Sequence, residues 1–210
     1  ISKTIITSTS EVYGSAIYSP INEDHPLQPQ SPYSASKIGA DNLALSYYNS
    51  FDMPVTIIRP FNTYGPRQSA RAIIPTIFSQ LISSKDISLG NLSTVRDFTF
   101  VEDLCMAYEI LLINNIFNGE VVNIGSNQDI SISHLIEKIF KITNLKKKIV
   151  VNEDRIRKNK SEVSHLLCDN KKILSLTDWK PKISLDEGLR KTYSWIEKNK
   201  NIYKSNLYNV

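Results

Sequence analysis

Two short β-branched runs, separated by one helical segment, constrain the fold of this chain most strongly. The first covers residues 4–8 (Thr-Ile-Ile-Thr-Ser), and the second covers residues 55–58 (Val-Thr-Ile-Ile). Between them, residues 33–50 carry small and apolar side chains at helical spacing. A helix that connects two buried strands favours a parallel pair, because parallel strands need such a crossover. The chain is therefore expected to have an α/β fold, with the polar residues after each strand meeting at one edge of a sheet.

The residues that follow the first run include the groups needed for acid–base chemistry. Thr9, Ser10 and Glu11 come where the strand ends and a loop begins. Further along, Tyr33 and Lys37 are four residues apart, and the proline before them can begin a helix. They are then expected on one helix face, one turn apart. An ammonium close to a phenol favours the phenolate, so the pair predicts a base that takes a proton from an alcohol.

A lone Tyr-x-x-x-Lys is common on surface helices, but here it is one of four motifs in register. They are residues 8–14 (Ser-Thr-Ser-Glu-Val-Tyr-Gly), 32–37 (Pro-Tyr-Ser-Ala-Ser-Lys), 59–67 (Arg-Pro-Phe-Asn-Thr-Tyr-Gly-Pro-Arg) and 96–103 (Arg-Asp-Phe-Thr-Phe-Val-Glu-Asp). In this order and spacing the chain resembles the extended short-chain dehydrogenase/reductases, the NAD-dependent nucleotide-sugar epimerases and dehydratases. The likeness extends from about residue 4 to about residue 197.

This resemblance implies the fold, the domains and the cofactor. Residues 1–65 are expected to form the C-terminal portion of a Rossmann-type parallel sheet that binds NAD and carries the catalytic motifs. Residues 66–210 are expected to form mainly a smaller α/β domain that binds the nucleotide sugar, with some segments returning to the Rossmann domain.

The resemblance also implies a role for each catalytic residue. Tyr33, assisted by Lys37, would take the proton of the C4 hydroxyl of a nucleotide hexose while NAD oxidises C4, and both residues would contact the cofactor. Thr9 would hydrogen-bond the C4 oxygen. Glu11 would remove the C5 proton once C4 is a ketone, because a proton next to a carbonyl is acidic enough for a carboxylate to abstract. Glu11 therefore favours dehydration over epimerisation.

Four further residues are expected to bind the substrate. The second strand ends near Asn62 and Arg67, which a turn and a surface charge would also explain; by resemblance the asparagine contacts the nucleotide sugar. Arg96 occupies the position where the family holds the diphosphate, and a guanidinium can bind two oxygens at once. Arg157 precedes a Ser-Glu-Val (161–163) and is the match for a phosphate-binding arginine, although a lysine follows it where the family usually has proline.

Ser10 bears on which sugar is dehydrated. Dehydratases that act on dTDP-glucose tend to have an aspartate at this position as the general acid, whereas Thr-Ser-Glu resembles GDP-mannose dehydratases and some dehydratases of N-acetylated nucleotide sugars. Ser10 is therefore expected to contact substrate, and the acid stays unassigned. Residues 31–41 and 66–72 resemble most closely the UDP- or GDP-N-acetylglucosamine 4,6-dehydratases of legionaminic acid synthesis. A 4-epimerase or reductase, and a non-catalytic fragment or subunit, are the alternatives.

The sequence lacks the expected cradle for the dinucleotide. Only 7 glycines are present, and no Gly-x-Gly-x-x-Gly or Gly-x-x-Gly-x-x-Gly occurs. In the resembled family that loop precedes the position where this chain begins, at Ile1. We therefore expect a chain without its N-terminal cofactor half, which does not catalyse alone.

Composition limits the other partners. The net charge of +4 comes partly from clusters such as residues 146–148 and indicates solvated surface rather than nucleic-acid binding. No apolar run approaches the roughly 20 residues of a membrane span. Cys105 and Cys168 have neither metal-ligand nor disulfide spacing, which fits a reducing compartment. We expect a soluble cytoplasmic protein without a metal ion, and the resemblance implies a homodimer formed through helices such as 33–50.

Overall fold

A three-stranded parallel sheet forms one part of the molecule in the computed structural model, which describes residues 2–156 and 162–203. Its strands lie in the order β1 (Thr4–Thr7), β2 (Val55–Pro60) and β6 (Glu120–Ile124). Both neighbouring pairs are parallel. The predicted α/β fold with a parallel, Rossmann-type sheet is confirmed.

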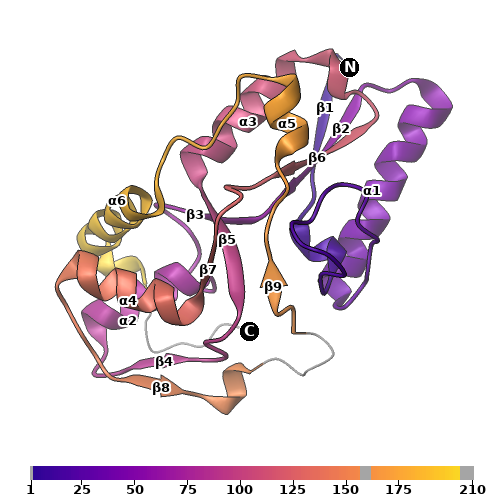
Figure 1. Ribbon diagram of the computed structural model, residues 1–210. Helices are drawn as coiled ribbons and strands as arrows, with labels where there is room; N and C mark the ends of the chain where they lie inside the picture. Colours follow the sequence, from indigo (N-terminus) through magenta and orange to yellow (C-terminus); the bar gives the residue numbers. More distant parts are fainter. Residues whose placement is uncertain (1, 157–161, 204–210) are drawn as a thin grey trace.

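Helices cover both faces of this sheet (Figure 1). α1 (Pro32–Phe51) lies on one face, and α3 (Val101–Ile113) and α5 (Lys171–Leu176) lie on the other. The core between the sheet and the second face consists of Ile58, Ala107, Leu111, Phe117, Val122, Ile124, Ile173 and Trp179. β2, the central strand, is buried along nearly its whole length, as its almost continuous apolar sequence predicted, whereas β1 is half-buried with Thr7 exposed.

A second part of the molecule is built around β5 (Val95–Phe100). This strand is parallel to β3 (Asn62–Tyr64) and β9 (His165–Leu166), and antiparallel to β7 (Asp129–Ser131). A separate pair joins β4 (Ile87–Leu89) and β8 (Ile149–Val151).

Three helices of the described chain complete this second part: α2 (Ile73–Ser83), α4 (Ile132–Thr143) and α6 (Leu185–Lys198). α6 packs on α2, α4 and β5. The 3-10 turns among the described residues are η1 (Ser10–Tyr13), η2 (Asn115–Phe117), η3 (Glu153–Arg155) and η5 (Lys200–Ile202).

Local backbone geometry sets two of the helix starts. α2 begins at Ile73 because Ala72 is extended, with ψ 149°. α5 begins at Lys171, whose backbone N–H donates to the Asp169 carboxylate at 3.0 Å. Within the described ranges, none of the helices combines the length and apolar character that crossing a membrane requires.

Candidate active site

A cavity of about 830 Å³ lies where the carboxyl ends of the parallel strands meet the second part of the molecule. Glu11 and Tyr33 line it from η1 and α1, Asn62 from β3, Arg96 from β5 and Arg155 from η3. Elements distant in sequence therefore supply its walls, and α2, β4 and α4 contribute further lining residues. Of the residues expected to act on substrate, the fold brings these four together: Glu11, Tyr33, Asn62 and Arg96.

A capped 3-10 turn presents Glu11 to the cavity. The Thr9 hydroxyl accepts a hydrogen bond from the Glu11 backbone N–H at 3.3 Å, which starts the turn directly after β1. The turn ends at Gly14, whose φ of 61° favours glycine, and a Cβ there would lie 2.8 Å from Cβ of Gln28. Ser10 is only 3% exposed and is not among the residues that line the cavity.

Tyr33 lies in the first turn of α1, where a reciprocal cap fixes the helix start. The Ser31 hydroxyl accepts from the Ser34 N–H, and the Ser34 hydroxyl accepts from the Ser31 N–H, both at 3.0 Å. The Tyr33 side chain is half exposed and lines the cavity. One turn later, Nζ of Lys37 donates to the Thr7 carbonyl at 2.9 Å, at the end of β1. The phenol and the ammonium are therefore on α1 beside the carboxyl end of the sheet.

Two carboxamides on the cavity wall have buried oxygens. Oδ1 of Asn62 and Oε1 of Gln68 accept no hydrogen bond from any residue that the structure describes. The Gln68 amide group donates to the Thr63 carbonyl at 2.6 Å, which fixes its oxygen as an acceptor. An unpaired buried acceptor is costly, and a hydroxyl or amide N–H of a ligand would satisfy it. Arg67 is exposed, has a φ of 67° and does not line the cavity.

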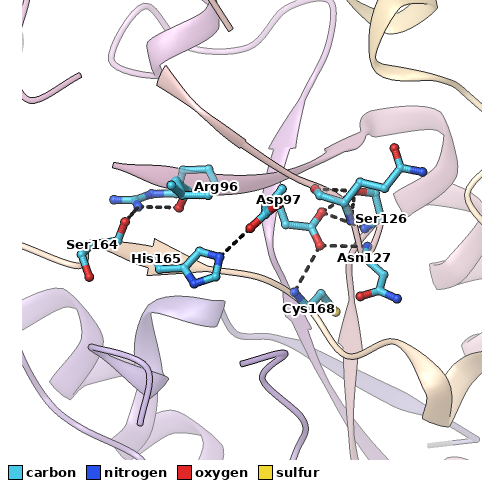
Figure 2. Close-up of polar contacts among 10 residues, drawn as sticks. Arg96, Asp97, Ser126, Asn127, Ser164, His165 and Cys168 are labelled. Atoms are coloured by element: carbon cyan, nitrogen blue, oxygen red, sulfur yellow. Dashed lines mark hydrogen bonds and ion pairs between the residues drawn. The ribbon is translucent and has the colours of Figure 1, made fainter. Parts of the chain in front are cut away.

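Three arginines, Arg71, Arg96 and Arg155, line the cavity, and backbone carbonyls hold the guanidinium groups of the last two. Arg96 donates to the Val95 carbonyl at 2.8 Å and to the Ser164 carbonyl at 3.3 Å, as Figure 2 shows for Ser164. Its other terminal nitrogen lies 3.7 Å from the Glu162 carboxylate, which also lines the cavity. Arg155 donates to the Ser88 carbonyl at 2.9 Å. Planar guanidinium groups suit the oxygens of a diphosphate.

The sequence did not predict every residue of this wall. Arg157, the predicted phosphate-binding arginine, lies outside the described residues, whereas Arg155 of the same polar segment lines the cavity. Arg155 reaches this place because Gly90 has no side chain: a Cβ there would collide with the Arg155 carbonyl. Gln68 and Arg71 also line the cavity. Both belong to the motif of residues 66–72, but the sequence predicted no role for either.

Buried Asp97 holds the end of the segment that contains β9. Its carboxylate accepts from the Ser126 N–H (2.8 Å), the Ser126 hydroxyl (2.6 Å), the Asn127 N–H (2.9 Å) and the Cys168 N–H (3.2 Å), as Figure 2 shows. Burial raises the pKa of Asp97, and these donors offset part of the shift. Nearby, Nε2 of His165 lies 2.6 Å from the Asp129 carboxylate. These contacts attach β9 to β5 and β7.

The residues present fit one end of the implied NAD. A half-exposed phenol and an ammonium next to a strand end suit the nicotinamide riboside, whose ribose hydroxyls can bind a lysine. The glycine-rich turn that would cradle the pyrophosphate does not occur in the sequence. Within residues 2–156 and 162–203, no group of three or more His, Cys, Asp or Glu could hold a metal ion.

The chain is similar to known nucleotide-sugar dehydratases over nearly its whole length. The sequence model of the GDP-mannose 4,6 dehydratase family matches residues 2–192. The chain is 32% identical to dTDP-D-glucose 4,6-dehydratase of Dictyostelium discoideum over 248 residues, covering 96% of this chain and 56% of that protein. It therefore spans little more than half the length of this curated relative.

Solved structures of a dehydratase and of an epimerase are similar to this chain in fold and sequence. The dTDP-glucose 4,6-dehydratase of Bacillus anthracis, in complex with NAD, is 34% identical with a TM-score of 0.88, covering 96% of this chain and 64% of that one. The UDP-glucuronic acid 4-epimerase of Bacillus cereus, in complex with UDP-glucuronic acid and NAD, is 29% identical with a TM-score of 0.85. There the match covers 94% of this chain and 62% of the other.

Proposed function

Because the chain belongs to the NAD-dependent epimerase/dehydratase family, we propose that it supplies the acid–base groups and the substrate site of a nucleotide-sugar 4,6-dehydratase. The observation that carries this proposal is the shared cavity of Glu11 and Tyr33, which come from η1 and α1. A phenol and a carboxylate on one sugar site provide the two bases that dehydration needs. The cofactor proposed is NAD, as in the Bacillus anthracis relative.

Tyr33 begins the reaction. Its phenolic oxygen takes the proton of the C4 hydroxyl, with the Lys37 ammonium one turn away on the same helix. NAD, when bound, supplies the oxidant for the sugar and later the reductant. Thr9, which is next to the Glu11 turn, hydrogen-bonds the C4 oxygen. Tyr33 and Lys37 also contact the ribose of the cofactor.

Glu11 makes the reaction a dehydration. Once C4 carries a carbonyl, the Glu11 carboxylate removes the acidified C5 proton. The C6 hydroxyl then leaves as water with a proton from a general acid that is not assigned, which gives a C5–C6 double bond. A hydride returned to C6, which the bound cofactor would supply, and a proton added at C5 then give the 4-keto-6-deoxy sugar. Ser10 is 3% exposed, so a substrate contact by its side chain would need η1 to move.

The nucleotide end of the substrate is proposed to lie along β5. Arg96 and Arg155 line the cavity and bind the diphosphate, and Arg96 would exchange its present Glu162 partner for phosphate oxygens. Arg67 and Arg157 remain proposed ligands from the sequence. Residues 1–65 are proposed as the Rossmann portion and residues 66–210 as mainly substrate-binding; the return of β6 to the first sheet supports the exchange of segments between them.

The proposed substrate is a UDP- or GDP-linked N-acetylglucosamine. The motifs of residues 31–41 and 66–72 support it, as do the acceptor oxygens of Asn62 and Gln68, which suit an acetamido N–H or a sugar hydroxyl. The main alternative is a 4-epimerase, because the Bacillus cereus relative with UDP-glucuronic acid has the same fold. A non-catalytic fragment or subunit is the second alternative.

We also propose that a second copy of the chain packs on α1. Leu43, Tyr47 and Phe51 recur at intervals of four and are 61%, 47% and 72% exposed, so they form an apolar stripe on its outer face. An exposed stripe of this kind is typical of a helix with a protein partner.

Product analysis tests the proposal. The protein, expressed with any coding sequence that adjoins it upstream, is incubated with NAD and UDP- or GDP-N-acetylglucosamine, GDP-mannose or dTDP-glucose in deuterium oxide. Dehydration predicts loss of water from the product, whereas epimerisation conserves the mass. Products that keep the mass of the substrate would contradict the dehydratase assignment and support the epimerase.

Two variants assign the bases. Tyr33→Phe should lose at least about a hundredfold in turnover, with binding nearly intact. Its control is Tyr47→Phe, on the same helix but outside the cavity. Glu11→Gln should stop C5 deuterium exchange while still permitting oxidation at C4, with exposed Glu102→Gln as its control. Wild-type turnover in the first variant, or wild-type exchange in the second, would refute the role.

A further inference from the structure

The helix that carries Tyr33 and Lys37 has little apolar burial. Of the 20 residues of α1, all of which the structure describes, Ser34 and Asp41 are buried. Ile38 is partly buried against an apolar cluster beneath η1. Ala44, Leu45 and Tyr48 are also half-buried, so the apolar contact of α1 is only partial. The fully buried side chains of α1 are both polar, and the position of the helix therefore depends on their contacts as well.

The main polar contact is a buried ion pair near the middle of the helix. Oδ2 of Asp41 lies 3.0 Å from both Nε and one terminal nitrogen of Arg59, near the end of β2. The Asp41 and Arg59 side chains are 1% and 4% exposed. The same Asp41 oxygen accepts from the Ser8 hydroxyl at 2.9 Å, directly after β1. One carboxylate thus joins α1 to the ends of two strands.

Arg59 extends the connection to the turn that carries Glu11. Its second terminal nitrogen donates to the Tyr13 hydroxyl at 3.0 Å, and that hydroxyl donates to Oδ1 of Asn123 on β6 at 2.7 Å. Tyr13 is the last residue of η1 and is completely buried. Burial raises the pKa of Tyr13 to about 12, so at neutral pH the phenol keeps the proton that it donates to Asn123.

We propose that Asp41 and Arg59 are positioning residues that fix α1 and η1 relative to each other, and so set the placement of Tyr33 against Glu11. Neither residue lines the cavity. Their effect on turnover rests on the proposed function, whereas their effect on α1 does not. A small misplacement of reacting groups can cost about a hundredfold in rate.

The test must separate this role from stability. Removing one partner of a buried ion pair leaves an unpaired charge, but replacing the whole group by apolar residues of similar volume is often tolerated. The informative variant is therefore the triple substitution Ser8→Ala, Asp41→Leu and Arg59→Met, which removes both charges and the hydroxyl that would lose its acceptor. Asp41→Asn, which keeps the volume and one oxygen, is the second variant. Lys138→Met, which breaks the exposed pair with Asp186, is the control.

Three measurements are made on each variant. The thermal midpoint should stay within about 5 °C of wild type in the triple variant. Amide exchange in residues 33–41 should be at least about tenfold faster, because the helix has lost its anchor. The kcat should fall about 30- to 100-fold with KM changed less than about threefold, since the nucleotide-binding wall is on other elements.

Each outcome decides the proposal. Unchanged amide exchange in α1 overturns the proposal whatever the turnover. Faster exchange with unchanged kcat also overturns it. So does a Lys138→Met control that changes exchange and kcat as much as the triple variant does. If the triple variant does not fold, Asp41→Asn must show faster exchange and lower kcat at unchanged KM, or the proposal fails. If wild type turns over none of the nucleotide sugars, the proposed function fails, and the exchange measurement alone decides whether the ion pair positions α1.

Discussion

Asp97→Asn should destabilise the protein through its hydrogen bonds rather than its volume. One oxygen of the carboxylate accepts two bonds from Ser126, and the other accepts the backbone N–H groups of Asn127 and Cys168. Asparagine keeps one oxygen, so whichever way its amide turns, two of these donors face an NH2 group. At least one of them is a backbone N–H at a side chain that is completely buried.

The loss follows from these contacts. A buried donor without an acceptor costs about 1–3 kcal/mol, and a hydrogen bond to a charged group contributes about 1.5–3 kcal/mol. Removing the buried charge offsets part of this, so we expect a loss of about 3 kcal/mol in the free energy of unfolding. For a protein of this size each kcal/mol lowers the midpoint by roughly 2–4 °C, giving a decrease of roughly 6–12 °C.

Urea and thermal unfolding of the variant provide the assay. The control is Asp129→Asn, which breaks the partly exposed pair with His165 and should cost less than about 1 kcal/mol. Amide exchange should quicken in residues 162–168, which Asp97 attaches to β5 through the Cys168 N–H. A loss below about 1 kcal/mol for Asp97→Asn, or equal losses in both variants, would refute the reasoning.

The pH dependence gives a second check. Burial raises the pKa of Asp97 above its ordinary 3.8, so the folded protein binds this proton more tightly than the unfolded chain does. The resulting stabilisation is complete below the pKa of Asp97 in the unfolded chain, and it is lost as pH rises through the pKa of Asp97 in the folded protein. The variant has no titrating carboxyl at this position and cannot gain this stabilisation, so the stability gap between wild type and variant should widen as pH falls through that window. A gap that narrows would contradict the direction of the shift.

Two further predictions concern the ligands. Gly90→Ala pushes a methyl group against the Arg155 carbonyl and should raise the KM for nucleotide sugar about tenfold with less change in kcat. The control is Gly39→Ala, where no atom lies within 4 Å of the added carbon. An unchanged KM in Gly90→Ala would show that Arg155 does not bind the substrate. Residues 1–210 alone should show no saturable NAD binding by calorimetry, because the glycine turn for the pyrophosphate is missing from the sequence. Stoichiometric binding would reveal a phosphate site elsewhere in the chain.

Local sequence determined the elements and the family of this protein. The β-branched runs predicted β1 and β2, and the Tyr33 and Lys37 spacing predicted their shared helix, because strand and helix periods are written in neighbouring residues. The four motifs predicted the family, which the comparison confirms. Periodicity and short motifs are properties of neighbouring residues, so the sequence alone was enough to predict these features.

Only the tertiary structure decided which residues face the cavity and what holds them there. Arg155 rather than Arg67 lines it, because the β4–β8 pair brings η3 over Gly90, a contact between segments more than sixty residues apart. In the same way Asp41 reads in the sequence as one more polar residue of an exposed helix. Its pairing with Arg59 arises because the crossover lays α1 across the end of β2, and no local pattern records which buried partner a charge will meet.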